Sequence, residues 1–297
     1  MDFLWFLSQF RTPFTEEFFQ AVTLFGQQTL LIVLICICFW CINKELAFQA
    51  GFTFCLSGTL VQGLKLAFRI PRPWILDPDF KPVQSAVPAA TGYSFPSGHT
   101  QSATAIYGTA GYKSRKPVMR LICFAMVLLI GFSRMFLGVH TPKDVLFAIL
   151  LSVLCIWLVE ALLKASRQKG QSYPIVLLAV VSVLAIVLYI YGYILASKGT
   201  VALSYAYDCA ETTGAALGFV VGYLLEERFV RFDPKQKAPI QVTKCVVGLL
   251  LLVVIQKALS FLPETSMFWL GFENLLLILF ITFFYPFLFQ KILLKRI

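Results

Sequence analysis

Charged residues are scarce in this sequence. Asp, Glu, Lys and Arg make up 13% of its 297 residues, whereas soluble domains average about 25%. Hydrophobic residues make up 59%. This composition excludes an ordinary soluble enzyme, an intrinsically disordered chain and a collagen-like chain, because all three need a more polar or a more glycine-rich sequence. It is typical of an integral protein that crosses a membrane several times.

Also missing is a cationic segment ahead of the first apolar stretch, so we do not expect a cleaved signal peptide. Residues 1–18 instead mix aromatic side chains, such as Trp5 and Phe10, with charged ones, such as Arg11 and Glu16. This mixture predicts an amphipathic helix at the membrane interface.

Nine apolar stretches are candidates for membrane-spanning helices. A helix rises about 1.5 Å per residue, so about 20 residues cross a hydrocarbon core of about 30 Å. Two of the nine stretches are short and carry small or polar residues, which indicates a place inside the bundle. We therefore expect an all-α, polytopic transmembrane helix bundle with about nine spans, over residues 20–42, 46–68, 97–112, 118–139, 144–163, 174–195, 213–226, 245–262 and 267–290.

The net charge of +10 has two explanations. It suggests nucleic acid as a partner, but membrane proteins also collect Lys and Arg in their cytoplasmic loops. If the nine spans alternate, one face receives 16 of the 25 cations and five acids, and the other receives nine cations and ten acids. The cation-rich face is then cytoplasmic, together with the C-terminus, and we expect no nucleic-acid partner. The N-terminus and the loops 69–96, 140–143, 196–212 and 263–266 face outward.

Three polar clusters stand at the ends of apolar stretches, and all three fall on the outward face. Ionisable groups in such places cost free energy and therefore usually mark function. The sequence has only two histidines, and both belong to these clusters. The clusters are Lys65 to Arg72-Pro73, then Pro96-Ser97-Gly98-His99, then Ser133-Arg134 through His140 to Asp144.

The cations in these clusters suit a phosphate group. The guanidinium groups of Arg72 and Arg134 match two phosphate oxygens at once, and Lys65 adds a compact charge. Ser97 and Gly98 open a predicted helix, whose free N–H groups and dipole favour an anion. The sequence therefore predicts a phosphate-binding site.

The two histidines and one acid suit general acid–base and nucleophilic chemistry. Thr141-Pro142 predicts a helix start with Asp144 in its first turn. Asp144 then lies about one turn from His140 and can orient its imidazole. One histidine can attack phosphorus while the other, His99, protonates the leaving oxygen.

The spacing Lys65-x6-Arg72-Pro73, Pro96-Ser97-Gly98-His99 and Ser133-Arg134-x5-His140-x3-Asp144 resembles the three-part signature of the type 2 phosphatidic acid phosphatase (PAP2) superfamily. The resemblance covers residues 65–144 and implies a six-helix core that extends to about residue 226. Residues 214–222 carry two overlapping G-x-x-x-G steps, which predict close helix packing. We expect an interfacial helix over 1–18, a phosphatase core over 19–226 and a C-terminal transmembrane extension over 227–297.

The resemblance also implies a role for each matched residue. It implies that His140 is the nucleophile and forms a phosphohistidine, that Asp144 orients it, and that His99 is the general acid and then the base. The phosphate would be held by Lys65, Arg72, Ser97, Gly98 and Arg134. The family needs no metal ion, and we expect no cofactor.

The leading hypothesis is a metal-independent phosphatase of the bacterial cytoplasmic membrane, which hydrolyses a lipid phosphate or diphosphate at the extracytoplasmic face. Candidate substrates are undecaprenyl diphosphate, phosphatidic acid, phosphatidylglycerol phosphate and a sphingoid-base phosphate. A sugar-phosphate phosphatase of the glucose-6-phosphatase type is an alternative, as is a non-catalytic membrane transporter or structural relative. A phosphotransferase is a further alternative, because an acceptor other than water can capture a phosphohistidine.

Overall fold

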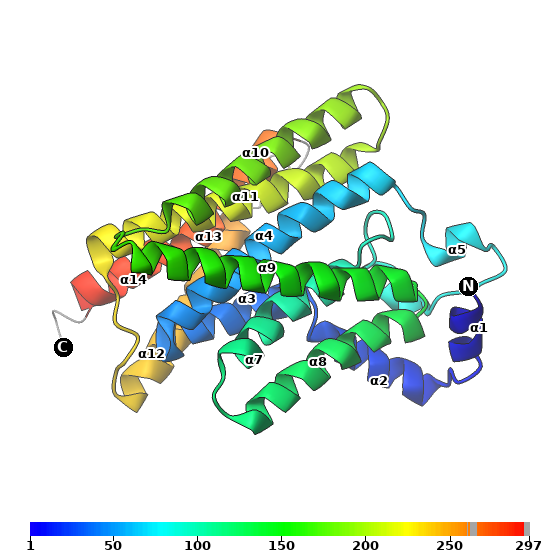
Figure 1. The fold of residues 1–297 in the computed structure, drawn as a ribbon, viewed down its shortest axis with the longest axis horizontal. Coiled ribbons are helices and arrows are strands. Elements are labelled where there is room, and N and C mark those ends of the chain that lie inside the picture. The colour runs from blue at the N-terminus through cyan, green and yellow to red at the C-terminus, as the bar shows by residue number, and fades with distance from the viewer. Residues whose placement is uncertain (260, 262–265, 294–297) are drawn as a thin grey trace. The chain divides into compact units, whose positions relative to one another are not determined.

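In the part of the chain that the structure describes, every element of regular secondary structure is a helix (Figure 1). The structure is a computed structural model, and it describes residues 1–259, 261 and 266–293. The chain divides into two compact units. Unit 1 comprises Met1–Ile32 and Leu60–Trp157, and unit 2 comprises Val33–Thr59 and Leu158–Ile297. The predicted all-α class is confirmed. Three predictions fall partly outside the described residues: the span 245–262 at residues 260 and 262, the outward loop 263–266 at residues 263–265, and the cytoplasmic C-terminus at residues 294–297.

Five helices are long and apolar enough to cross a membrane, and a bent pair of helices counts as a sixth if it is taken as one span. The five are α8 (Pro117–Phe136), α9 (Pro142–Gln168), α10 (Ile175–Ser197), α12 (Ala238–Leu259) and the helical run Met267–Gln290; the pair is α2 (Pro13–Leu24) with Gln28–Ile42. These spans make the protein an integral membrane protein. Nine spans are not shown. The predicted spans 46–68 and 213–226 correspond to α4 (Lys44–Phe68) and α11 (Leu203–Leu225), which contain too many polar and small residues to reach the same hydropathy. The predicted span 97–112 is divided into three short helical elements.

Unit 1 contains short helices that surround α8. The single helix expected over 1–18 is instead α1 (Asp2–Ser8) followed by α2, since Thr12 caps α2 and Pro13 occupies its first turn. Helices α2, α6 and α7 pack against α8. The other elements of this unit are α3 (Gln28–Ile37), which continues into unit 2, α5 (Pro73–Leu76), the 3₁₀ turn η2 (Gln84–Ala86), α6 (Gly98–Ala103), the π-helical η3 (Thr104–Gly108) and α7 (Thr109–Lys113).

Unit 2 contains α10 and α11, which pack against each other, and α13 (Met267–Leu279), which packs against α11. Helix α11 begins at Leu203, inside the loop predicted over 196–212. The predicted close packing at the G-x-x-x-G steps is confirmed: a Cβ added at Gly214 would lie only 1.9 Å from the carbonyl oxygen of Gly271. The remaining elements are the π-helical η1 (Cys38–Ile42), η4 (Glu226–Val230), η5 (Phe280–Phe284) and η6 (Leu288–Leu293), with α14 (Tyr285–Phe287) between the last two.

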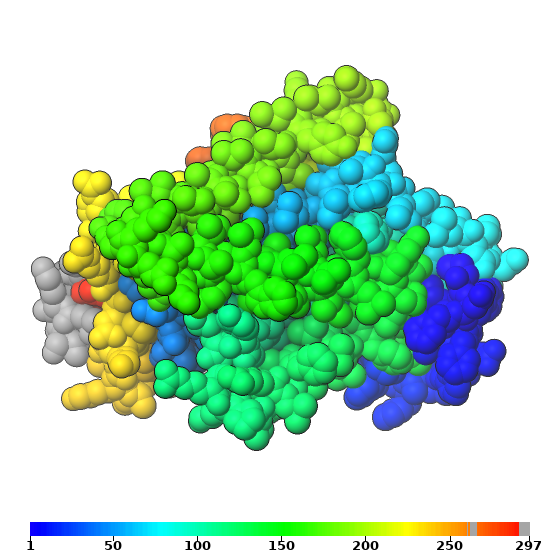
Figure 2. All heavy atoms as spheres, in the orientation of Figure 1, coloured from blue at the N-terminus to red at the C-terminus, as the bar shows by residue number. Residues whose placement is uncertain are grey.

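Helix α9 presents an apolar stripe at the molecular surface, where its side chains are visible in the space-filling view (Figure 2). Leu146, Leu150, Leu154 and Trp157 are all exposed. They recur every three or four residues and therefore share one face of the helix. A stripe of this kind matches the surface that a membrane-spanning helix turns toward lipid tails.

Unit 2 buries charged side chains that have polar partners. Glu226 is fully buried and accepts hydrogen bonds from Lys44 Nζ at 3.1 Å and from the backbone N–H of Phe232 at 2.6 Å. Lys44 contacts Glu227 as well, at 3.0 Å. The buried ammonium of Lys244 donates to the carbonyl oxygen of Pro234. These contacts satisfy charges that would otherwise be costly to bury.

Candidate active site

The three polar clusters of the sequence come together within unit 1. Lys65 lies in the last turn of α4, Arg134 in the last turn of α8 and Asp144 in the first turn of α9. His99 stands in the first turn of α6 and interacts electrostatically with Arg134, His140, Lys65 and Arg72. The predicted site residues therefore share one neighbourhood, although they come from four helices and two loops.

Local packing fixes the turn that carries His140. The carbonyl oxygen of Arg134 accepts the backbone N–H groups of Val139 and His140 at the end of α8. Leu137 and Val139 are fully buried against residues 83–90 of the long loop. The sequence between the arginine and the histidine thus forms a tight, anchored turn rather than a free loop.

Asp144 holds this histidine from the start of α9. The helix begins at Pro142, as predicted, and Asp144 Oδ2 accepts the backbone N–H of Thr141 at 2.8 Å. The same oxygen lies 3.6 Å from Nδ1 of His140. A carboxylate beside Nδ1 favours the imidazole tautomer with its proton on that nitrogen.

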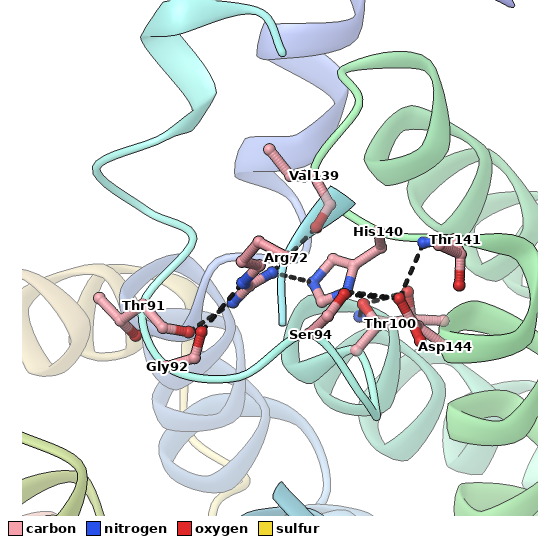
Figure 3. A network of polar contacts seen from close by, with 10 residues as sticks. Arg72, Thr91, Gly92, Ser94, Thr100, Val139, His140, Thr141 and Asp144 are labelled. Atoms are coloured by element: carbon pink, nitrogen blue, oxygen red, sulfur yellow. Dashed lines mark hydrogen bonds and ion pairs between the residues drawn. The ribbon is translucent and has the colours of Figure 1, made fainter. Parts of the chain in front are cut away.

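Arg72 forms a hydrogen bond with the other ring nitrogen of His140, Nε2. Its Nη1 atom donates to His140 Nε2 at 3.0 Å, so the imidazole lies between Arg72 and Asp144 (Figure 3). Because a guanidinium only donates, Nε2 must be unprotonated and the ring neutral. Burial, and then the charge of Arg72, lower the pKa of His140 below its ordinary value, although Asp144 opposes this shift. The result is a neutral imidazole with its lone pair on Nε2.

Arg72 is itself oriented by backbone carbonyl groups. Its Nε donates to Gly92 at 3.0 Å, its Nη2 donates to Thr91, and its Nη1 also donates to Val139 at 3.0 Å (Figure 3). The side chain is 4% exposed. The loop after α5 therefore fixes this cation beside the reactive nitrogen.

Arg134 is less completely paired than Arg72. Its side chain is fully buried, and Nη1 donates to the hydroxyl of Thr23 at 2.8 Å. Its Nε and Nη2 atoms are buried without a hydrogen-bond partner. Such unpaired donors are costly in a protein interior unless an anion binds them.

The start of α6 lies next to Lys65. Ser97 caps the helix, and its hydroxyl accepts the backbone N–H of Thr100 at 3.4 Å. A Cβ added at Gly98 would meet only Lys65 Nζ, at 3.9 Å. The glycine thus leaves its backbone open toward the ammonium group, which suits an anion between the two.

Sequence reasoning did not single out Ser94 or Thr23. Ser94 is 1% exposed, and its hydroxyl donates to Asp144 Oδ2 at 2.7 Å (Figure 3). Its only signal was its place two residues before the Pro96-Ser97-Gly98-His99 motif. Thr23 lies in an apolar stretch 111 residues away from Arg134, and nothing in the sequence connects the two.

Comparisons with known proteins indicate the family of this chain. The chain matches the PAP2 superfamily model over residues 46–168 and the model of the PAP2 superfamily phosphatase transmembrane extension over residues 210–296. It is 30% identical over 174 residues to phosphatidylglycerophosphatase B of Bacillus subtilis, which covers 54% of this chain and 82% of that protein. It is 33% identical over 113 residues to undecaprenyl-diphosphatase BcrC of the same organism, or 38% of this chain and 55% of that protein.

A solved structure also resembles this one. It is the first transmembrane PAP2 type phosphatidylglycerolphosphate phosphatase from Bacillus subtilis, with a TM-score of 0.48 and 25% sequence identity over 55% of this chain and 84% of that chain. The two family models match separate parts of the sequence, and the match to the Bacillus subtilis phosphatidylglycerophosphatase B extends over most of that enzyme. The chain therefore belongs to the PAP2 superfamily, as an integral membrane phosphatase that hydrolyses phosphoric esters or anhydrides.

Proposed function

We propose that this protein removes phosphate from a lipid phosphate or diphosphate at the extracytoplasmic face, through a phosphohistidine on His140. The observation that carries the proposal is the fully buried guanidinium of Arg134, whose Nε and Nη2 atoms have no partner. Phosphate oxygens fit the fork of a guanidinium and would satisfy both donors. His140, neutral and held by Asp144, stands beside it as a nucleophile.

In the first step, Nε2 of His140 attacks phosphorus. An N–P bond forms while the P–O bond to the lipid breaks, and His99 gives its proton to the leaving oxygen. Asp144 stabilises the positive charge that the imidazole gains. Arg72, which donates to Nε2 in the resting state, transfers this hydrogen bond to a phosphate oxygen.

In the second step, water attacks phosphorus on the side opposite His140. His99 accepts the proton of the water, the N–P bond breaks and its electron pair returns to Nε2. Phosphate leaves, and both histidines return to their initial protonation states. The negative charge that develops on the phosphoryl oxygens in both steps is stabilised by Lys65, Arg72 and Arg134, with the start of α6.

A lipid substrate is supported by the surroundings of Arg72. Phe68, Ile75 and Leu76 lie close to it in sequence and are all exposed, at 58%, 61% and 49%. Apolar side chains beside a cationic site suit a molecule with a phosphate head and a hydrocarbon tail. Two relatives are named for phosphatidylglycerophosphate and undecaprenyl diphosphate, and we take these two lipids as the first candidates.

The outward orientation is supported by the charges of unit 1. Lys113, Arg115 and Lys116 precede α8, and the candidate site lies at the other end of that 20-residue helix. A helix of this length extends about 30 Å, the thickness of the hydrocarbon core. If the basic loop is cytoplasmic, the site faces outward. We divide the chain into an interfacial segment over 1–18, a phosphatase core over 19–226 and a membrane extension over 227–297. If all nine predicted stretches cross the membrane, the C-terminus lies in the cytoplasm.

Phosphate release from the purified full-length protein tests the activity. The panel contains undecaprenyl diphosphate, phosphatidylglycerophosphate, phosphatidic acid, a sphingoid-base phosphate and glucose 6-phosphate, each with and without EDTA. We expect release from at least one lipid, unaffected by EDTA, and none from His140→Ala. Release from glucose 6-phosphate alone would favour a sugar-phosphate phosphatase, and a folded protein that releases nothing would favour a non-catalytic relative.

Thiol labelling of intact cells tests the orientation. Ser85 lies in the long loop beside the site and is exposed, and Arg115 lies in the basic loop and is exposed. We expect Ser85→Cys to react with a membrane-impermeant maleimide, above the labelling of the parent protein, and Arg115→Cys to react only after the cells are permeabilised. The opposite pattern would reverse the orientation.

A further inference from the structure

Among the described residues, Arg134 donates one side-chain hydrogen bond, and its acceptor lies on α2, a helix outside the signature motifs. The acceptor is the hydroxyl of Thr23, in the last turn of α2, 2.8 Å from Nη1. Thr23 is 2% exposed and Arg134 is fully buried. Both side chains belong to unit 1, and water does not compete for this contact.

The geometry of a guanidinium gives this contact a direction. Nε and Nη2 lie along one edge of the planar group, and Nη1 points away from that edge. Since Thr23 accepts from Nη1, the Nε–Nη2 edge stays available, and these are the two atoms that lack a partner. Two parallel N–H groups along one edge are the arrangement that binds two phosphate oxygens.

The chain just after Thr23 also packs against the general-acid candidate. A Cβ added at Gly26 would lie 2.6 Å from Cγ2 of Ile130 and 3.2 Å from the carbonyl oxygen of His99. Tyr107, on the same helical stretch as His99, donates its hydroxyl to the carbonyl oxygen of Phe25 at 3.1 Å. The break between α2 and α3 therefore packs against two of the helices that carry phosphate-site residues, α6 and α8.

We infer that Thr23 is a positioning residue of the phosphate site, whose hydroxyl holds Nη1 of Arg134 so that the Nε–Nη2 edge is directed at the phosphoryl group. This inference rests on the proposed function. Thr23 lies outside residues 46–168, which match the superfamily model, so the motifs that define the site do not contain it. Helix α2 thereby contributes to the phosphate site, in addition to forming half of a candidate membrane span.

Two substitutions at this position separate the hydroxyl from the packing. Thr23→Val keeps the shape and removes the acceptor, and Thr23→Ser keeps the acceptor. We expect Thr23→Val to lower kcat/KM by about 10-fold, the size expected for one hydrogen bond to a charged group, and Thr23→Ser to keep most of the activity. Inhibition by orthovanadate, which resembles pentacoordinate phosphorus, weakens by the same factor in Thr23→Val. If Thr23→Val does not fold, Thr23→Ala replaces it.

A double-mutant cycle with Arg134→Gln completes the test. If Thr23 acts through Arg134, adding Thr23→Val to Arg134→Gln causes no further loss of activity. Equal activity and equal vanadate inhibition in Thr23→Val and Thr23→Ser would overturn the inference, as would a full additional 10-fold loss in the double variant. Failure of the proposed function looks different: either His140→Ala would still release phosphate, or the unsubstituted protein would release none from any lipid of the panel.

Discussion

The buried charges of the candidate site, in unit 1, and those of unit 2 differ in how completely their polar atoms are hydrogen-bonded. In unit 2, Glu226 is held by Lys44 and by the backbone of Phe232, and Lys244 donates to a carbonyl oxygen and lies 4.9 Å from the ring centre of Phe232. In unit 1, buried atoms of Arg134, His140 and Asp144 have no hydrogen-bond partner.

The difference distinguishes charges that stabilise the fold from charges that serve chemistry. Removing one partner of a buried ion pair lowers the stability of the protein, because the remaining charge is then buried without a partner. A charge that is left partly unpaired costs stability in the resting protein and is compensated only when a substrate supplies the missing acceptor. Removing a buried charge of the candidate site should therefore lower activity but not stability. Removing a buried charge of unit 2 should lower stability but not the activity of the folded protein.

The largest effect is expected at Arg134. Arg134→Met should reduce kcat/KM by about 10²- to 10³-fold, the usual loss when one group that stabilises transition-state charge is removed. The temperature of half-unfolding in detergent should stay equal or rise, since the variant no longer buries an incompletely paired cation. Activity and thermal unfolding are measured on the same preparation. A large fall in thermal stability would show that Arg134 is a structural charge like those of unit 2.

The reverse result is expected at Glu226. Glu226→Leu leaves the N–H of Phe232 without its acceptor and Lys44 with Glu227 alone, so the free energy of unfolding should fall by about 2–4 kcal/mol. The folded fraction should keep its kcat/KM within about 2-fold. Glu227→Gln is the matched control: this side chain is 29% exposed, and the loss of a partly exposed ion pair should cost about 1 kcal/mol or less. Equal destabilisation by the two variants would contradict the distinction.

A smaller effect is expected at Ser94, the residue that orients Asp144. Ser94→Ala removes a 2.7 Å hydrogen bond to the carboxylate, and kcat should fall by about 10-fold with little change in KM. Ser102→Ala is the control, because Ser102 is a buried serine of α6 that bonds to the side chain of Gln101. Loss of the same size in both variants would assign Ser94 to packing alone.

The sequence predicted those parts of the site that depend on local spacing. Thr141-Pro142 with an acid in the next turn specifies a helix start, and α9 begins at Pro142 as expected. Local rules of this kind need only the neighbouring residues. The contact between Thr23 and Arg134 joins residues that are 111 positions apart, and a threonine in an apolar stretch carries no mark of its partner.

Hydropathy predicted where most of the helices lie but not how many of them are apolar enough to cross a membrane. Helix α11 begins at Leu203, ten residues before the predicted span 213–226. Its first half is polar, and polar residues in a membrane protein suggest a loop, so this half was predicted as part of the loop 196–212. Helix α4 likewise places Gln49, Thr53 and Ser57 inside the fold. High hydropathy marks helices that face lipid. A helix that packs against other helices can carry polar residues, and hydropathy alone then does not identify it as a membrane span.

The smallest and most specific effect concerns pH. The neutral imidazole of His140 is the reactive form, and burial, followed by the charge of Arg72, lowers its pKa. Activity should therefore persist as pH falls through 6.5, the ordinary histidine value, and kcat/KM should decline only at lower pH.

Arg72→Gln removes one cause of the pKa shift while burial remains. The acidic limb of the plot of kcat/KM against pH should therefore move partway back toward 6.5, whatever the maximum value of kcat/KM in this variant. Using one substrate for both proteins cancels the titration of its own phosphate. An acidic limb that stays in place in Arg72→Gln would show that the hydrogen bond to Nε2 does not govern the nucleophile, and the contrast between the two units would then rest on Arg134 and Asp144.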